Sequence, residues 1–120
     1  MLEYIKVFVT LLVVDSVYLW STGNLFGAMV KNIQNESMSI RYGSALIVYV
    51  LLSYGLVHFI IKPGRSILDA AILGAVVYGV FDFTNYALFR NYGLPVAIMD
   101  TVWGSVLMAS TAFIYHSVKL

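Results

Sequence analysis

The sequence predicts an all-α membrane protein, a four-helix bundle of antiparallel transmembrane helices that forms a single domain over residues 1–120. Composition is the first observation behind this prediction. Hydrophobic residues make up 61% of the chain and charged residues only 11%, and the mean hydropathy is +0.88. A soluble domain of this size would need far more charge on its surface. The second observation is that the apolar residues fall into four long stretches.

Each of the four apolar stretches approaches the roughly 20 residues that a helix needs to cross about 30 Å of hydrocarbon. The predicted spans cover about residues 7–26, 43–61, 67–88 and 95–115. Helices are predicted because a bilayer offers no partners to unpaired backbone groups and because the alternating pattern of strands is absent. Short turns after the second and third spans place neighbouring helices antiparallel and in contact.

The connection between the first two spans, residues 27–42, is the only long one. Apolar residues recur at helical spacing across its start, at Phe26, Met29, Val30 and Ile33. This spacing predicts a short helix that lies in the membrane interface, and a plain polar loop is the alternative.

Charged, capping and aromatic residues mark the ends of the spans. Ser66 is expected to cap the third helix, with Asp69 in its positive first turn. Four positive residues lie on the side of the two chain ends and three on the other, which favours cytoplasmic termini. They are Lys6, Lys62, Arg65 and Lys119 on the first side, and Lys31, Arg41 and Arg90 on the second. The tyrosines interpreted as aromatics of the membrane interface are Tyr42, Tyr49, Tyr86 and Tyr92.

Several classes of function have no support in the sequence. The net charge of +1 excludes a basic nucleic-acid-binding arm, and the absence of cysteine excludes disulfides and thiolate metal sites. No spacing of His, Asp and Glu fits a metal site, no Ser–His–acid grouping is present, and no Gly-rich phosphate loop follows a strand. We therefore predict no metal, no cofactor and no catalytic residue, and we expect the lipid bilayer as a partner.

Three acidic residues break the apolar pattern: Asp15 in the first span, Asp82 in the third and Asp100 in the fourth. A charged side chain inside a bilayer costs at least a few kcal/mol, so it needs a partner or a purpose. Asp82 lies past the middle of its span and Asp100 before the middle of the next. Because these two spans run in opposite directions, both acids are expected in the same half of the membrane.

Polar neighbours lie on the same helical faces as the acids. Tyr78 and Asn85 share the face of Asp82, and Trp103 shares the face of Asp100. These spacings predict a polar interior made of the three acids and their neighbours, inside an apolar surface that faces lipid.

Two interpretations of this polar interior stay open. In the structural one, neutral or hydrogen-bonded acids lock the bundle by accepting from Tyr78, Asn85, Trp20 or Trp103, because burial favours the protonated form of a carboxyl. In the functional one, the acids bind a proton or a cation, and the protein is a small transporter or channel. Asn85 and Tyr78 would then orient Asp82.

Other functions are kept as alternatives. A short chain with almost no aqueous part could be a non-catalytic accessory subunit of a larger membrane complex or lipid-processing system, or it could form a homo-oligomer. A further alternative is the binding of a lipid or another apolar ligand between the helices.

The third and fourth spans carry two motifs that resemble a known family. They are YGVFDFTNYA at residues 78–87 and DTVWG at residues 100–104. The sequence resembles the DUF2177 family of predicted membrane proteins over essentially its whole length, and this resemblance implies a four-helix membrane fold. The first span has Tyr18 three residues after Asp15, where the family typically has tryptophan. Asp15-x-x-Tyr18 and Asp100-x-x-Trp103 echo each other, which is compatible with an internal duplication of a two-helix unit.

Overall fold

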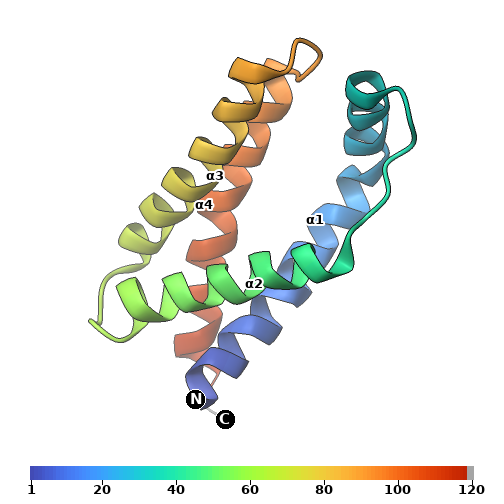
Figure 1. The fold of residues 1–120 in the computed structure, drawn as a ribbon. Coiled ribbons are helices and arrows are strands. Elements are labelled where there is room, and N and C mark those ends of the chain that lie inside the picture. The colour runs from blue at the N-terminus through green and yellow to red at the C-terminus, as the bar shows by residue number, and fades with distance from the viewer. Residues whose placement is uncertain (119–120) are drawn as a thin grey trace.

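The computed structural model describes residues 1–118, and in this part of the chain every regular element is a helix (Figure 1). The elements are α1 (Leu2–Gln34), α2 (Tyr42–Leu56) with the π-helical turn η1 (Val57–Ile61) directly after it, α3 (Ile67–Leu88) and α4 (Leu94–Ser117). The predicted all-helical bundle is confirmed. Lys119, one of the four positive residues on the side of the two chain ends, lies outside the described residues.

Within residues 1–118, three helical segments are long and apolar enough to cross a membrane: Tyr42–Ile61, Ile67–Leu88 and Leu94–Ser117. Two of the short connections follow from their sequence. The side-chain oxygen of Ser66 accepts a hydrogen bond of 3.1 Å from the backbone N–H of Asp69 at the start of α3. The chain after α3 turns at once into α4, which has Gly93 as its N-cap and proline in its first turn. The predicted span at residues 7–26 lies within α1 and stays a prediction.

Helix α1 is longer than its sequence pattern suggested. The apolar residues after Phe26 continue α1 to Gln34 and form neither a separate interfacial helix nor a loop. Two features explain this. No proline interrupts the stretch, and the buried Met29 packs with Tyr92 and the start of α4. The helix ends where Asn35 adopts a left-handed conformation with φ of 61°, which asparagine tolerates better than most residues.

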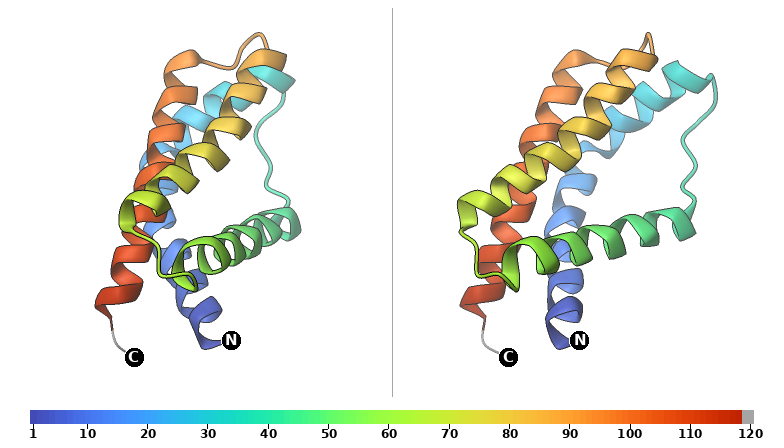
Figure 2. Two further views of the ribbon diagram at one scale, coloured as in Figure 1. Left: turned by 90° about the vertical axis from the view of Figure 1, so that its left-hand side faces the viewer. Right: turned by 60° about the vertical axis from the view of Figure 1, so that its left-hand side comes forward.

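Helices α3 and α4 form a closely packed antiparallel hairpin (Figure 2). The close approach depends on glycine: the space that a Cβ of Gly74 would need is occupied by the backbone carbonyl of Gly104. The ring of Tyr78 in turn lies where a Cβ of Gly104 would be. Small residues at helix crossings are how membrane helices come into backbone contact.

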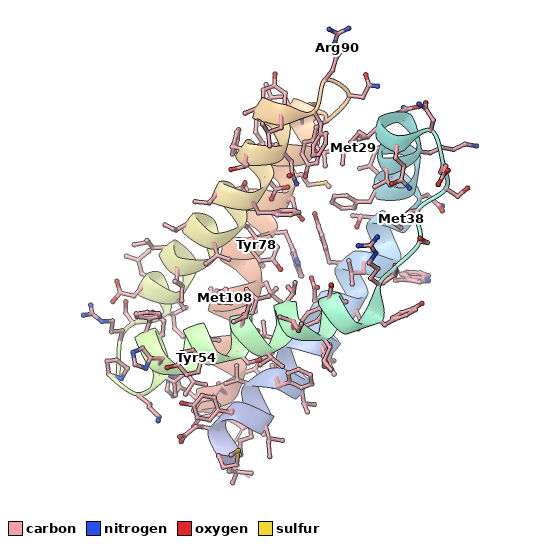
Figure 3. The ribbon with its side chains drawn as sticks, in the orientation of Figure 1. Met29, Met38, Tyr54, Tyr78, Arg90 and Met108 are labelled. Carbon is pink, nitrogen blue, oxygen red and sulfur yellow. The ribbon has the colours of Figure 1, made fainter. Side chains whose placement is uncertain are left out.

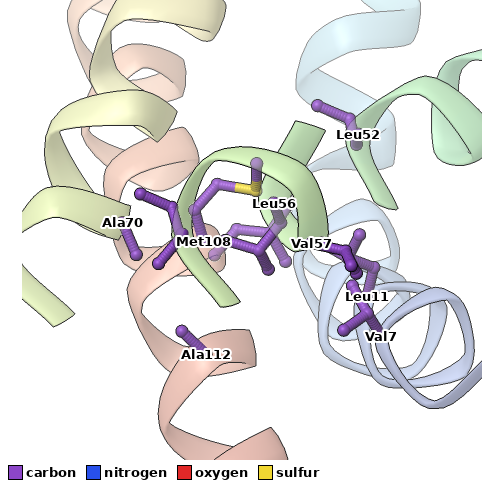
Figure 4. Packing of buried hydrophobic residues seen from close by; sticks show 10 residues of the cluster. Val7, Leu11, Leu52, Leu56, Val57, Ala70, Met108 and Ala112 are labelled. Atoms are coloured by element: carbon purple, nitrogen blue, oxygen red, sulfur yellow. The ribbon is translucent and has the colours of Figure 1, made fainter. Parts of the chain in front are cut away.

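The apolar core lies where α1, α4 and the end of α2 meet (Figure 4). Leu11 of α1, Leu56 at the end of α2 and Leu107 of α4 are fully buried. The residues that complete the core are Val7, Leu52, Val57, Ile60, Ala70, Met108 and Ala112. Most other large apolar side chains are exposed, as expected for helices that face lipid.

Helix α2 departs from the simple antiparallel arrangement. The start of α1 and the end of α4 lie at the same end of the molecule, and these two helices run antiparallel (Figure 1). In contrast, α2 crosses the molecule obliquely and is far from parallel to the α3–α4 hairpin (Figure 2). It packs on α1 and makes hardly any contact with α3. One side of the bundle is therefore open between α2 and α3.

Candidate functional site

The three acids inside the apolar pattern are all buried. Asp82 has no exposed surface, and Asp15 and Asp100 are 5% and 6% exposed. The hydroxyls of Tyr18 and Tyr78 lie within electrostatic reach of all three carboxyl groups. Tyr78 is on the inner side of α3, whereas Arg90 projects from the α3–α4 connection away from the bundle (Figure 3). The acids thus converge on one interior region.

A reciprocal pair of hydrogen bonds joins α1 to α4. Tyr18 of α1 donates to Oδ1 of Asp100 at 2.8 Å, and Trp103 of α4 donates its Nε1–H to Oδ1 of Asp15 at 2.8 Å. The rings of Tyr18 and Trp103 stack between the two bonds, with 4.5 Å between centroids and 3° between planes. On each helix the acid comes three residues before the aromatic. Because the two helices are antiparallel, the acid of each helix lies beside the aromatic donor of the other, and two hydrogen bonds form. We call these four residues the α1–α4 clasp.

The clasp gives the repeated motif a geometric role. Each Asp-x-x-aromatic sequence supplies one acceptor and one donor to the other helix, and Tyr18 is the donor from α1. This pairing of the first helix with the fourth explains the two similar motifs without a duplication of the chain. An internal duplication stays a prediction.

Asp15 also connects α2 to the cluster. The hydroxyl of Tyr49 donates to Oδ2 of Asp15, while Trp103 donates to Oδ1. Both oxygens of this carboxylate therefore accept from neutral donors on two other helices. Asp15 therefore joins α1 to both α2 and α4.

Asp82 has a different environment. The hydroxyl of Tyr92 donates to its Oδ1 at 2.6 Å, but Oδ2 is buried and has no hydrogen-bond donor in residues 1–118. The carboxyl group of Asp100 lies close enough to Asp82 for the two to interact directly. Burial and the neighbouring carboxyl of Asp82 both raise the pKa of Tyr92, so its hydroxyl keeps its proton and stays a donor.

Neutral donors surround the acids. In residues 1–118 none of the three acids forms an ion pair with a basic side chain. In the same part of the chain, no group of three acidic or histidine side chains is arranged to hold a metal ion. The cluster is therefore organised by O–H and N–H donors.

The donors differ in part from those expected. Trp103 donates to an acid, as one interpretation proposed. Trp20 is 87% exposed and contributes nothing to the interior. Tyr78 and Asn85 donate to none of the acids within residues 1–118, and Asn85 instead interacts with Tyr92.

Tyr49 was interpreted as an interface aromatic, and this interpretation is wrong, because Tyr49 lies well inside α2 and donates to the buried Asp15. Tyr92 lies in the α3–α4 connection, where an interfacial position stays a prediction, and it also donates to the buried Asp82. The sequence position of Tyr49 could have indicated its role in the interior. Tyr49 lies seven residues inside its helix, whereas an aromatic of the membrane interface lies near a helix end. The role of Tyr92 as a donor could have been inferred from its position in the short turn after α3, which leads the chain back toward Asp82.

The hydroxyl of Tyr18 can be tested without changing the ring stack. We expect Tyr18→Phe to lower the free energy of unfolding by about 1 kcal/mol, because Asp100 loses a donor and interhelical bonds in membranes contribute about 0.6 kcal/mol on average. Tyr42→Phe is the matched control, since Tyr42 is 78% exposed. The measurement is equilibrium unfolding in mixed micelles with increasing SDS. Equal stability of the two variants would contradict a contribution from this bond.

Comparison with known proteins gives one match. Residues 1–116 match the family described as "Predicted membrane protein (DUF2177)". No curated protein and no solved structure matches the chain. Since the match covers nearly the whole sequence, the chain belongs to the DUF2177 family of predicted membrane proteins.

Proposed function

We propose that the protein is a small proton-linked membrane transporter in which Asp82 and Asp100 hold the exchangeable proton. One observation carries this proposal: Asp82 is fully buried, its Oδ2 has no donor, and the neighbouring group is a second carboxyl, that of Asp100. Two carboxyl groups in a shared apolar site resist simultaneous ionisation, so one proton is held between them.

The surrounding donors support a division of roles among the acids. Asp15 accepts on both oxygens and holds α1, α2 and α4 together. The Asp82–Asp100 pair has one oxygen left without a donor, which is where a shared proton satisfies the pair. With the hydroxyls of Tyr18 and Tyr92 donating to the pair and no basic partner within residues 1–118, this environment suits a proton better than a metal cation.

The arrangement of α1 supports a fourth crossing of the membrane. Its start lies beside the end of α4, where Lys6 stands over the ring of Tyr115 with 5.9 Å to the centroid. Near its other end, the backbone carbonyl of Asn32 accepts from the side chain of Asn91 in the α3–α4 connection. Helix α1 thus runs between the same two levels as α4, and we propose that both cross the bilayer.

Liposomes that contain the purified protein and a trapped pH indicator test the transport proposal. With an imposed proton gradient, we expect the wild type to carry a proton flux and Asp82→Asn or Asp100→Asn to reduce it to that of protein-free liposomes. Asp69→Asn is the control, because Asp69 lies in the first turn of α3, far along the helix from the pair. No flux in the wild type, or full flux in Asp82→Asn, would overturn the proposal.

Infrared spectroscopy tests the proton site independently of transport. The wild type should show a carboxylic-acid C=O band that disappears at high pH, and Asp82→Asn should lack it. An accessory subunit whose acids only lock the bundle predicts different results. Its Asp→Asn variants keep their partner complexes in mild detergent, and any carboxylic-acid band of the wild type stays unchanged as the pH rises.

A further inference from the structure

A groove follows the open side of the bundle between α2 and α3. One part has a volume of about 300 Å³ and is lined by eight residues: Val48, Leu51, Leu52, Gly55, Phe59, Leu73, Val77 and Met108. The adjoining part, also about 300 Å³, is lined by Val48, Leu52, Val77, Tyr78, Phe81 and Asp100. The two parts share Val48, Leu52 and Val77 and so lie side by side. We call them together the α2–α3 groove.

The α2–α3 groove is apolar except at one end. Its lining residues are aliphatic or aromatic until the wall reaches Asp100, which is 6% exposed. Asp100 therefore connects the groove to Asp82, which has no exposed surface of its own. Because the groove opens at the side of the bundle, where large apolar side chains face lipid, a molecule can enter it from the bilayer.

We propose that the α2–α3 groove binds a single-chain cationic amphiphile from the bilayer, with its hydrocarbon chain along Leu52 and Val77 and its ammonium headgroup at Asp100. Charge complementarity selects this occupant. Asp100 is an acid without a basic partner in residues 1–118, and the aromatic rings of Tyr78 and Phe81 line the groove beside it. A carboxylate with aromatic faces is a favourable site for an ammonium group.

This inference rests on the proposed function, because the ammonium group and the shared proton compete for Asp100. The headgroup brings one positive charge, and the pair releases one proton to water, so the net charge of the cluster does not change. The titratable groups close to the pair are Tyr18 on α1, Tyr78 on α3 and Tyr92 in the α3–α4 connection, while Asp15 of α1 accepts from Tyr49 of α2. Tyr18 and Tyr92 donate to the pair as neutral hydroxyls, so the exchange involves the Asp82–Asp100 proton.

Tetradecyltrimethylammonium tests this inference, since its fixed charge cannot itself supply a proton. The protein is placed in phosphatidylcholine nanodiscs, empty nanodiscs are subtracted, and binding and proton release are measured by calorimetry and a pH indicator. We expect saturable binding with release of one proton per protein. Tetradecanol, which lacks the charge, and tetramethylammonium, which lacks the chain, should bind at least about tenfold more weakly.

Two neighbouring valines on α3 provide a matched pair of variants. Val77 lines the groove and is 40% exposed, while Val76 lies outside the groove and is 56% exposed. We expect Val77→Phe to weaken binding at least about tenfold and Val76→Phe to have no effect, while Asp100→Asn abolishes binding and proton release. Equal binding of tetradecanol, or binding that Val77→Phe and Asp100→Asn leave unchanged, would overturn the inference.

The infrared band separates this inference from the proposed function. If the wild type shows the pH-dependent carboxylic-acid band but binds no alkylammonium, the inference fails and the proton site stands. If the band is missing from the wild type, the proton site fails, whatever the binding result.

Discussion

Replacing Gly74 with alanine is expected to destabilise the α3–α4 hairpin strongly. The new Cβ would overlap the backbone carbonyl of Gly104 and come within 2.9 Å of Cγ of Met108. A backbone carbonyl cannot move aside as a flexible side chain does, so the two helices must separate. Overpacking of this kind costs about 1–3 kcal/mol, and occasionally more.

Gly79→Ala is the matched control on the same helix. There the new Cβ would lie 3.4 Å from Cγ2 of Thr101, a distance that a small shift of the side chain accommodates. We expect the midpoint of unfolding in SDS mixed micelles to drop strongly for Gly74→Ala and little for Gly79→Ala. Equal midpoints would show that the helices are not in backbone contact at Gly74.

Removing the carboxylate of Asp15 should have the largest effect among the acids on stability. Asp15→Ala leaves the hydroxyl of Tyr49 and the indole N–H of Trp103 without their acceptor, and it does so at the junction of α1, α2 and α4. Each buried donor that loses its partner costs about 1–3 kcal/mol. We expect Asp15→Ala to lower the unfolding free energy by more than Tyr18→Phe, which removes only one bond.

Asp15→Asn separates the role of the hydrogen bonds from that of the charge. The amide oxygen still accepts one bond, so we expect a stability between those of the wild type and Asp15→Ala. The same proteins should keep the infrared band of the Asp82–Asp100 pair, because Asp15 holds helices together and does not carry the exchangeable proton. Loss of the band in Asp15→Asn would show that all three acids titrate as a unit.

Burial of the acids could be predicted from the sequence, whereas their partners could not. The high cost of a charge in lipid is enough to predict that Asp15, Asp82 and Asp100 turn inward. Which donor meets which acid depends on how helices far apart in the chain are placed. Tyr49 lies 34 residues from Asp15, and Trp103 lies 88 residues from it. Helical periodicity relates residues on one helix, and it does not predict which residues of different helices come into contact.

The extent of the helices was predictable where the sequence has turn formers. The third span follows Pro63-Gly64, and α3 begins at Ile67, three residues after Gly64. The fourth span follows Gly93, and α4 begins at Leu94 with Pro95 in its first turn. The end of α1 has no such signal, because its continuation past Phe26 depends on the packing of Met29 against Tyr92. The oblique course of α2, and with it the α2–α3 groove, also depends on packing between helices and has no mark in the sequence.

The meeting of α1's start and α4's end at one end of the molecule has a practical consequence (Figure 1). On the proposed topology, in which α1 and α4 both cross the bilayer, a reporter domain fused before α1 and another fused after α4 would occupy the same aqueous compartment. Two copies of the protein could likewise be joined in tandem by a short hydrophilic linker, without an added membrane crossing, which offers a direct route to obligate dimers of defined composition.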